Sequence, residues 1–195
     1  MIKSIKPDPP IIPFVSQAEW REWLEQNHSL ECGIWLQFYK KGSGITSVNY
    51  AEALDEALCF GWIDGQVKRG DEKYYIQKFT PRRKRSMWSK RNIENIARLE
   101  SEGKMAPPGW REVEAARSDG RWERAYDSPG NATVPEDLLQ ELAKDPATLA
   151  HFESLNKANK FAITWRLQSA RTQATRNKRF EAILDMLANG DKFHP

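Results

Sequence analysis

The amino-acid sequence predicts an α+β protein, in which a mixed domain with a small antiparallel sheet and flanking helices precedes a small all-helical domain. Short aromatic and β-branched runs that are typical of strands occur only in the first half of the chain. A loop-like segment, SPGNATVP, follows at 128–135, and every later apolar run has helical spacing. Strands followed by a series of helices are the pattern of α+β folds.

Length and composition suit one medium domain with or without a small second one. The chain has 195 residues, 39% of them hydrophobic, and its eight Trp and eight Phe supply enough apolar area for a core. Mean hydropathy is −0.73, and no apolar run approaches the roughly 20 residues that span a bilayer, so we expect no membrane insertion. The N-terminus shows no secretory or lipidation pattern, which predicts a cytoplasmic protein.

Prolines and helix-capping residues predict the first two segments of the chain. Residues 1–13 contain four prolines and predict an extended arm. The first helix begins at Ser16, which forms a capping box with Glu19, while Val15 and Trp20 close a hydrophobic staple.

A strand and a second helix follow the first helix. The run at 33–41 is short, aromatic and begins with glycine, which predicts a strand, and Asn49 with Glu52 predicts the next capping box. Residues 62–67 and 73–79 flank a glycine turn and predict a β-hairpin.

The remaining elements are helices. Ser89 caps a third helix, and Pro107 opens a fourth. Together the elements predict an α+β domain at 14–127, a linker at 128–135 and a helical domain at 136–195.

The most unusual stretch of sequence is basic. From Lys78 to Arg91 there are seven cations and no acid, with two aromatic residues among them. Cations neutralise phosphates and aromatic rings stack on bases, and a helix N-terminus adds free N–H groups for an anion. The predicted anion- or nucleic-acid-binding residues are therefore Lys78, Phe79, Arg82, Arg83, Arg85, Trp88, Ser89, Lys90, Arg91 and Asn92.

Two further interpretations of the charges remain open. The basic stretch is also what a solvated connector would look like, with its cations paired to acidic helices and Trp88 in the core. A second run without acids lies between Glu153 and Glu181, and it predicts a secondary basic face. That face consists of Arg171, Arg176 and Arg179. If both basic runs share one face, the case for anion binding improves.

A second candidate site lies where the second helix ends and the hairpin begins, at Cys59, Phe60, Trp62 and Asp64. Asp64 beside Trp62 is a candidate general base with a raised pKa, and Cys59 is a candidate reactive thiol. The alternatives are that Cys59 is a small buried residue and that Asp64 pairs with an arginine of the basic stretch or bonds a turn backbone. Arg82, Arg83 and Trp88 would close an enzyme or small-anion pocket here.

Known catalytic and metal-binding patterns are missing from the sequence. There is no GxSxG, HExxH or P-loop motif, so we name no catalytic residue, and whether the protein is an enzyme stays open, with the balance toward none. Two cysteines and three scattered histidines make no metal pattern, and we expect no metal and no cofactor.

Several motifs resemble one known family. ALCFGWIDGQ (57–66), FTPRRKRSMWSKRN (79–92), GKM (103–105) and GRWERAY (120–126) resemble the YdeI/OmpD-associated, or bacteriocin-protection, family. PEDLLQEL (135–142) and ARTQATRNKRF (170–180) resemble its helical OmdA-type domain, although the proline and glutamate of the usual AK-x-P-E-T-R form are missing. The resemblance implies stress or bacteriocin tolerance and a link to an outer-membrane porin, but no reaction, cofactor or catalytic residue.

The leading hypothesis is a non-enzymatic cytoplasmic binding protein whose basic, aromatic face binds a polyanion, nucleic acid first. The first alternative is an enzyme or small-anion pocket around Phe60–Asp64 and Arg82–Trp88. The second is a partner-protein adaptor that binds another protein through the helical C-terminal domain.

Overall fold

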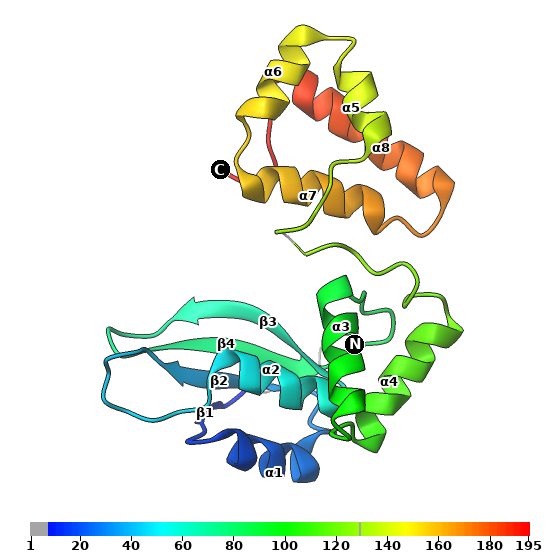
Figure 1. The fold of residues 1–195 in the computed structure, drawn as a ribbon. Coiled ribbons are helices and arrows are strands. Elements are labelled where there is room, and N and C mark those ends of the chain that lie inside the picture. Colours follow the sequence, from blue (N-terminus) through cyan, green and yellow to red (C-terminus); the bar gives the residue numbers. More distant parts are fainter. Residues whose placement is uncertain (1–7, 129) are drawn as a thin grey trace, which may run out of the picture. The chain divides into compact units, whose positions relative to one another are not determined.

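A computed structural model describes residues 8–128 and 130–195, so part of the predicted N-terminal arm, residues 1–7, lies outside the described residues (Figure 1). The fold is α+β, as the sequence predicts. The chain forms two compact units. The first contains the described residues up to 86 together with 94–119, and the second contains residues 87–93 and the described residues from 120 onward.

The first unit is built on a four-stranded sheet with the strand order β1-β2-β4-β3. Its strands are β1 (Ile11–Pro13), β2 (Ile34–Tyr39), β3 (Trp62–Arg69) and β4 (Tyr74–Pro81). β1 runs parallel to β2, whereas the other pairs are antiparallel, so the sheet is mixed and the predicted antiparallel sheet is corrected. The Trp35 backbone N–H donates to the carbonyl of Pro10, and prolines suit this edge because they lack an N–H.

Helices make up most of the remaining described residues. The first four are α1 (Gln17–Asn27), α2 (Tyr50–Cys59), α3 (Lys90–Ser101) and α4 (Pro107–Ser118). The last four are α5 (Glu136–Leu142), α6 (Pro146–Ser154), α7 (Lys157–Gln168) and α8 (Gln173–Ala188). No helix in the described part of the chain is both long and apolar enough to cross a membrane.

The start of α1 differs in one contact from the sequence-based expectation. Ser16 Oγ accepts from the Glu19 N–H at 3.2 Å, as predicted, but the Glu19 carboxylate accepts from the Val15 N–H. Val15 is 61% exposed, so the predicted staple is wrong. Phe14 instead packs on Trp20 with ring centroids 5.0 Å apart, because an aromatic ring buries more apolar area than valine does.

The other local signals of the first unit are confirmed. Asn49 and Glu52 form a complete capping box at the start of α2. β3 and β4 form the predicted antiparallel hairpin, with a register shift between Asp64 and Val67. The core between the helices and the sheet is aromatic, since the Trp20 ring lies 6.1 Å from both Trp62 and Phe79.

The second unit has its own apolar core from α5–α8. Its fully or nearly buried members are Leu138, Leu142, Phe152, Leu155, Ile163, Leu167, Ile183 and Leu187. Side-chain caps define the starts of three of these helices, at Asp145, Asn156 and Thr172. Each cap satisfies a backbone N–H of the first turn, which fixes where the helix begins.

Candidate ligand-binding site

The predicted basic face is divided between the two units. Lys78, Phe79, Arg82, Arg83 and Arg85 belong to the first unit, and the predicted residues from 88 to 92 belong to the second. The ten residues therefore do not form one site within a single unit.

The two aromatic residues of the basic stretch are buried. Phe79 has no exposed surface and packs against Trp20, and Trp88 is 1% exposed, with its ring 5.0 Å from that of Trp122. Neither ring presents a face to solvent, so the base-stacking role predicted for them is corrected. Trp88 is a core residue, as the alternative interpretation held.

Several polar members of the stretch have structural partners. Arg82 is buried and its backbone N–H donates to the Gly61 carbonyl. Buried Ser89 accepts from the backbone N–H of buried Asn92 at 3.2 Å, which confirms the predicted cap. Lys90 forms an ion pair of 2.7 Å with Asp127.

Exposed cations remain at a tight turn of the first unit. The Ser86 backbone N–H donates to the Arg83 carbonyl, and the Arg83 N–H donates to Ser86 Oγ. Between them, Lys84 and Arg85 point to solvent, and Arg85 has a φ of 75°, the one positive φ of a non-glycine residue in the described ranges. A side chain in this left-handed region costs about 1–2 kcal/mol.

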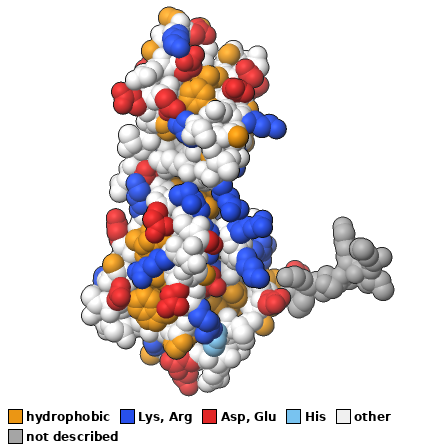
Figure 2. Space-filling view, turned by 90° about the vertical axis from the view of Figure 1, so that its right-hand side faces the viewer, with side chains coloured by type: hydrophobic (Ala, Val, Ile, Leu, Met, Phe, Trp, Pro, Cys, Tyr) orange, Lys and Arg blue, Asp and Glu red, His pale blue; other side chains and the backbone are white. Residues whose placement is uncertain are grey.

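Other members of the predicted basic faces lie elsewhere. The Lys78 Nζ lies 5.8 Å from the centroid of the Trp35 ring on the sheet. Arg91 and Arg171 are exposed in the second unit. Figure 2 shows Lys and Arg side chains gathered over part of the face in view, so surface cations are clustered there.

Two arginines of the secondary basic face hold the second unit together. Arg176 pairs with Asp137 at 2.7 Å, which ties α8 to α5 and lowers the pKa of the Asp137 carboxyl. Arg179 donates from Nη1 to the Arg166 carbonyl at 2.7 Å and to Ser169 Oγ at 3.1 Å. These bonds occupy part of each guanidinium group, so both arginines stabilise the fold of the second unit.

The Cys59–Asp64 cluster is built differently from a catalytic site. Burial raises the pKa of the Cys59 thiol to about 12, so Cys59 is a buried neutral residue, as the alternative interpretation held, and not the candidate reactive thiol. Asp64 Oδ2 accepts from two neutral side-chain donors, the Tyr50 hydroxyl and Gln77 Nε2, both at 3.0 Å, and neither an arginine nor a turn backbone is its partner in these bonds.

The two aromatic members of this cluster also serve the core. Trp62 is fully buried and its Nε1–H donates to the His28 carbonyl at 2.7 Å. Phe60 is 5% exposed and carries the Arg21 guanidinium 5.2 Å from its ring centroid. No group of three or more His, Cys, Asp or Glu side chains among the described residues is arranged to hold a metal ion.

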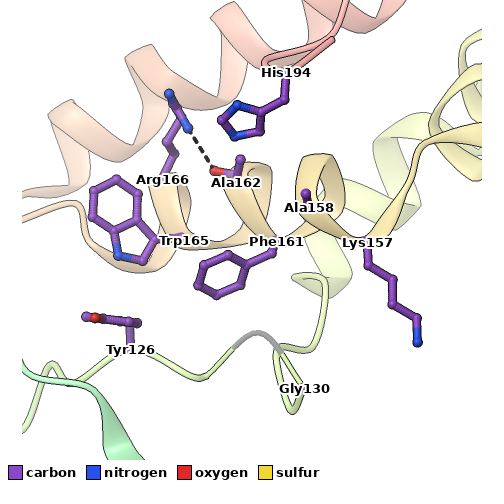
Figure 3. Close-up of a pocket in the computed structure, with 9 residues that line it drawn as sticks. All are labelled: Tyr126, Gly130, Lys157, Ala158, Phe161, Ala162, Trp165, Arg166 and His194. Carbon is purple, nitrogen blue, oxygen red and sulfur yellow. Dashed lines mark hydrogen bonds between the residues drawn. The ribbon is translucent and has the colours of Figure 1, made fainter. Parts of the chain in front are cut away.

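A pocket that the sequence did not reveal lies in the second unit. Its volume is about 810 Å³ (Figure 3). Its lining residues are Tyr126, Gly130, Lys157, Ala158, Phe161, Ala162, Trp165, Arg166 and His194. We call it the α7 pocket, because most of these residues belong to α7.

One face of α7 supplies the apolar wall of the α7 pocket. Ala158, Phe161, Ala162 and Trp165 have the i, i+3, i+4, i+7 spacing of a helix face. The rings of Phe161 and Trp165 project from α7 toward the segment that carries Tyr126 (Figure 3). The Tyr126 and Trp165 ring centroids are 6.2 Å apart at 86°, an edge-to-face pair.

The charge of the α7 pocket has one sign. Its lining includes Lys157, Arg166 and His194 and no acidic side chain. Lys157 is exposed at the start of α7, while the Arg166 guanidinium stacks 3.7 Å from the Phe193 centroid and donates to the Ala162 carbonyl at 3.2 Å. A cavity lined by cations without acids favours a negative ligand.

Only some of the features that form the α7 pocket can be recognised in the sequence. The helical spacing at 158–165 and the absence of acids between Glu153 and Glu181 were visible. What could not be seen is that Tyr126, far away in sequence, comes to face Trp165. This placement depends on the backbone of Tyr126, which is bonded to Trp88 and Lys90.

The described residues therefore form an α+β protein of two units, and the second unit contains the α7 pocket. The chain belongs to the family described as Domain of unknown function (DUF8412), whose model matches residues 12–112, more than half of the chain. Residues 131–190 match the model described as Bacteriocin-protection, YdeI or OmpD-Associated, so the resemblance is confirmed for the C-terminal part. Comparison with curated proteins and with solved structures found no match.

Proposed function

We propose that this is a binding protein whose C-terminal unit holds a small, planar, negatively charged organic ligand in the α7 pocket. The observation that carries the proposal is the lining itself, in which the rings of Tyr126, Phe161 and Trp165 and the side chains of Lys157 and Arg166 occur without an acid. The rings offer stacking surface for a planar body, and the cations favour a carboxylate, sulfonate or phosphate on it.

The size of the α7 pocket supports a small molecule. Pockets for drug-sized ligands have volumes of about 300–1,000 Å³ and apolar walls with a few polar groups, and this one, at about 810 Å³, falls within that range. An aromatic pair contributes about 0.5–1.5 kcal/mol beyond the area it buries. Phe161 and Trp165 therefore provide most of the affinity in this proposal, and Lys157 provides selectivity for charge.

The domain match gives this proposal a biological setting. All lining residues except Tyr126 and Gly130 lie within the 131–190 match or its C-terminal extension. We propose that ligand binding in the α7 pocket serves the bacteriocin-protection role in that family's description, and that it operates in the cytoplasm.

A fluorescence titration tests the proposal with two probes of similar shape. The anionic probe is 8-anilinonaphthalene-1-sulfonate, and its neutral counterpart is N-phenyl-1-naphthylamine. We expect saturable binding of both, with the anion tighter. Lys157→Gln should weaken the sulfonate about two- to fivefold and leave the neutral probe unchanged, since an exposed charge pair contributes about 0.2–1 kcal/mol.

Matched variants separate the α7 pocket from general surface effects. Phe161→Ala should weaken both probes, whereas Leu139→Ala, which truncates a 41% exposed apolar residue of α5, should weaken neither. Lys178→Gln removes an exposed cation of α8 outside the lining and should leave the sulfonate affinity unchanged. The proposal would be refuted if the two probes bind with equal affinity. It would also be refuted if Lys178→Gln weakens the sulfonate as much as Lys157→Gln does.

Polyanion binding by the turn at 83–86 is a second candidate function. The observation that favours it is Arg85, a cation kept in a backbone conformation that glycine adopts more cheaply. Without stacking rings, contact would be to phosphates alone, and neutralising three of them on single strands gives a log K versus log salt slope of roughly −2.

Fluorescence anisotropy with labelled single-stranded RNA across a salt series tests this second candidate. The variant Arg83→Gln/Lys84→Gln/Arg85→Gly removes the three exposed cations. Lys68→Gln/Arg69→Gln/Lys73→Gln removes three other exposed cations of the same unit. Loss of binding in the first variant only is expected, and equal loss in both would show that no specific surface exists.

A further inference from the structure

A second pocket lies in the first unit, where the connection from β2 to α2 folds over the end of the sheet. Its volume is about 440 Å³. The connection reads KKGSGITSVN at 40–49, and with Tyr50 and Tyr75 it provides most of the lining. Because the pocket is confined to the first unit, it is independent of the α7 pocket and of the proposed function.

The backbone of the connection carries two N–H groups that have no hydrogen-bond partner among the described residues. Gly42 and Gly44 have φ of 88° and 75°, a region that favours glycine. The Ser43 N–H donates to the Lys40 carbonyl and the Ile45 N–H to Ser43 Oγ. The N–H groups of the two glycines make no hydrogen bond within the described residues, and a Cβ at either would meet nothing within 4 Å.

The side chains add donors and positive charge without a counter-charge. The lining contains Lys40 and Lys41 and no acidic residue. The Lys40 Nζ donates to the Asp71 carbonyl at 3.0 Å, which leaves the exposed Lys41 ammonium as the nearest uncommitted cation of the loop. Hydroxyls at Ser43 and Thr46 add further donors that suit phosphate oxygens.

The other side of the pocket is apolar and aromatic. Tyr75 is stacked on Phe38 with centroids 5.1 Å apart, and burial raises the pKa of the Tyr75 phenol, which is therefore neutral. Ile45, which is 45% exposed, and Tyr50, whose hydroxyl donates to Asp64, also belong to the lining. A ligand with only a phosphate would leave this wall uncovered.

We infer that this pocket binds a small phosphate monoester with an aromatic body. The phosphate lies against the N–H groups of Gly42 and Gly44 and the Lys41 ammonium. The aromatic body lies against Tyr50, Tyr75 and Ile45.

An NMR titration of the full chain with phenyl phosphate, inorganic phosphate and phenol tests this inference. Phenyl phosphate should shift the backbone amide signals of Gly42 and Gly44 saturably and bind more tightly than inorganic phosphate, and phenol should shift neither glycine. Lys41→Gln should weaken phenyl phosphate about tenfold, the effect of losing one charge-assisted hydrogen bond.

Two matched controls complete the experiment. Lys73→Gln removes an exposed lysine outside the lining, and Gly103→Ala imposes a similar strain, at φ 67°, far from the loop in sequence. Gly44→Ala should weaken binding and Gly103→Ala should not, while the spectra show that both are folded. Absence of saturable glycine shifts, or equal weakening by Lys73→Gln, overturns the inference whatever the α7 pocket binds.

Discussion

Tyr126 meets Trp165 edge to face, with ring centroids 6.2 Å apart and an interplanar angle of 86°. The two residues come from the segment before α5 and from α7, and their rings form one end of the α7 pocket. The Tyr126 backbone is fixed independently of its ring, since its N–H donates to the Trp88 carbonyl and its carbonyl accepts from the Lys90 N–H. The ring can therefore be removed without releasing the segment.

Replacing Tyr126 with alanine should affect binding more than folding. We expect the affinity for anilinonaphthalene sulfonate to fall about fivefold, because an aromatic contact contributes about 0.5–1.5 kcal/mol. The free energy of unfolding in urea should fall by no more than about 1.5 kcal/mol, since the partly exposed ring leaves a gap that water can enter. A loss of stability large enough to unfold the protein would show that Tyr126 is a core residue and not a pocket wall.

Arg85→Gly should stabilise the protein or leave its stability unchanged. Glycine adopts the φ of 75° at no steric cost, which recovers up to about 1–2 kcal/mol, although the greater freedom of glycine in the unfolded chain offsets roughly 0.5–1 kcal/mol. Urea unfolding measures the difference. Arg83→Gly, at a turn position without positive φ, is the control and should destabilise. If Arg85→Gly is the more destabilising of the two, the turn is not strained at Arg85.

Only one of the two thiols should react in the folded protein. Burial raises the pKa of Cys59 to about 12, whereas Cys32 is partly exposed. With a disulfide reagent at neutral pH, we expect fast modification of Cys32 and modification of Cys59 only on unfolding. Cys32→Ser should abolish the fast phase. A fast phase that survives in Cys32→Ser would mean that Cys59 is accessible and would reopen its reactive role.

Asp127 should contribute to stability in a pH-dependent way. The hydrogen bond from Lys90, at 2.7 Å, lowers the pKa of the Asp127 carboxyl, and Gln168 also donates to it. A lowered folded pKa means that the contribution is present above the ordinary aspartate pKa and is lost as pH falls through the lowered value. The contribution is about 1 kcal/mol or less, because Lys90 is largely exposed.

Thermal unfolding from pH 6 down to pH 3 measures this contribution. Asp127→Asn should be less stable than the wild type at pH 6, and the two curves should converge as the carboxyl protonates. Glu136→Gln, an exposed acid at the start of α5, is the control and should track the wild type more closely. Curves that stay parallel over the whole range would contradict the assigned ion pair.

Local signals in the sequence predicted most of the fold. The caps at Ser16, Asn49 and Ser89 and the hairpin around Gly70 were predictable because each depends on neighbours within a few residues. The parallel pairing of β1 was not, since it is a long-range contact made by a proline-rich segment.

The candidate sites were harder to predict than the fold. Charge and aromatic content drew attention to the basic stretch, but the sequence cannot show that Phe79 and Trp88 point inward. The α7 pocket depends on a tertiary contact between Tyr126 and Trp165. The second pocket, in the first unit, depends on the positive φ of Gly42 and Gly44 in the connection from β2 to α2. Neither pocket corresponds to a recognisable motif in the amino-acid sequence.

The most direct test of the α7 pocket is the indole N–H region of the ¹H–¹⁵N spectrum during titration with anilinonaphthalene sulfonate. Trp165→Phe identifies the Trp165 signal, and the buried Trp20 and Trp62 indoles serve as internal references. We expect a saturable shift of the Trp165 signal at the concentrations where probe fluorescence rises, with the two reference signals unchanged. Fluorescence that rises while the Trp165 signal stays in place would contradict binding in the α7 pocket.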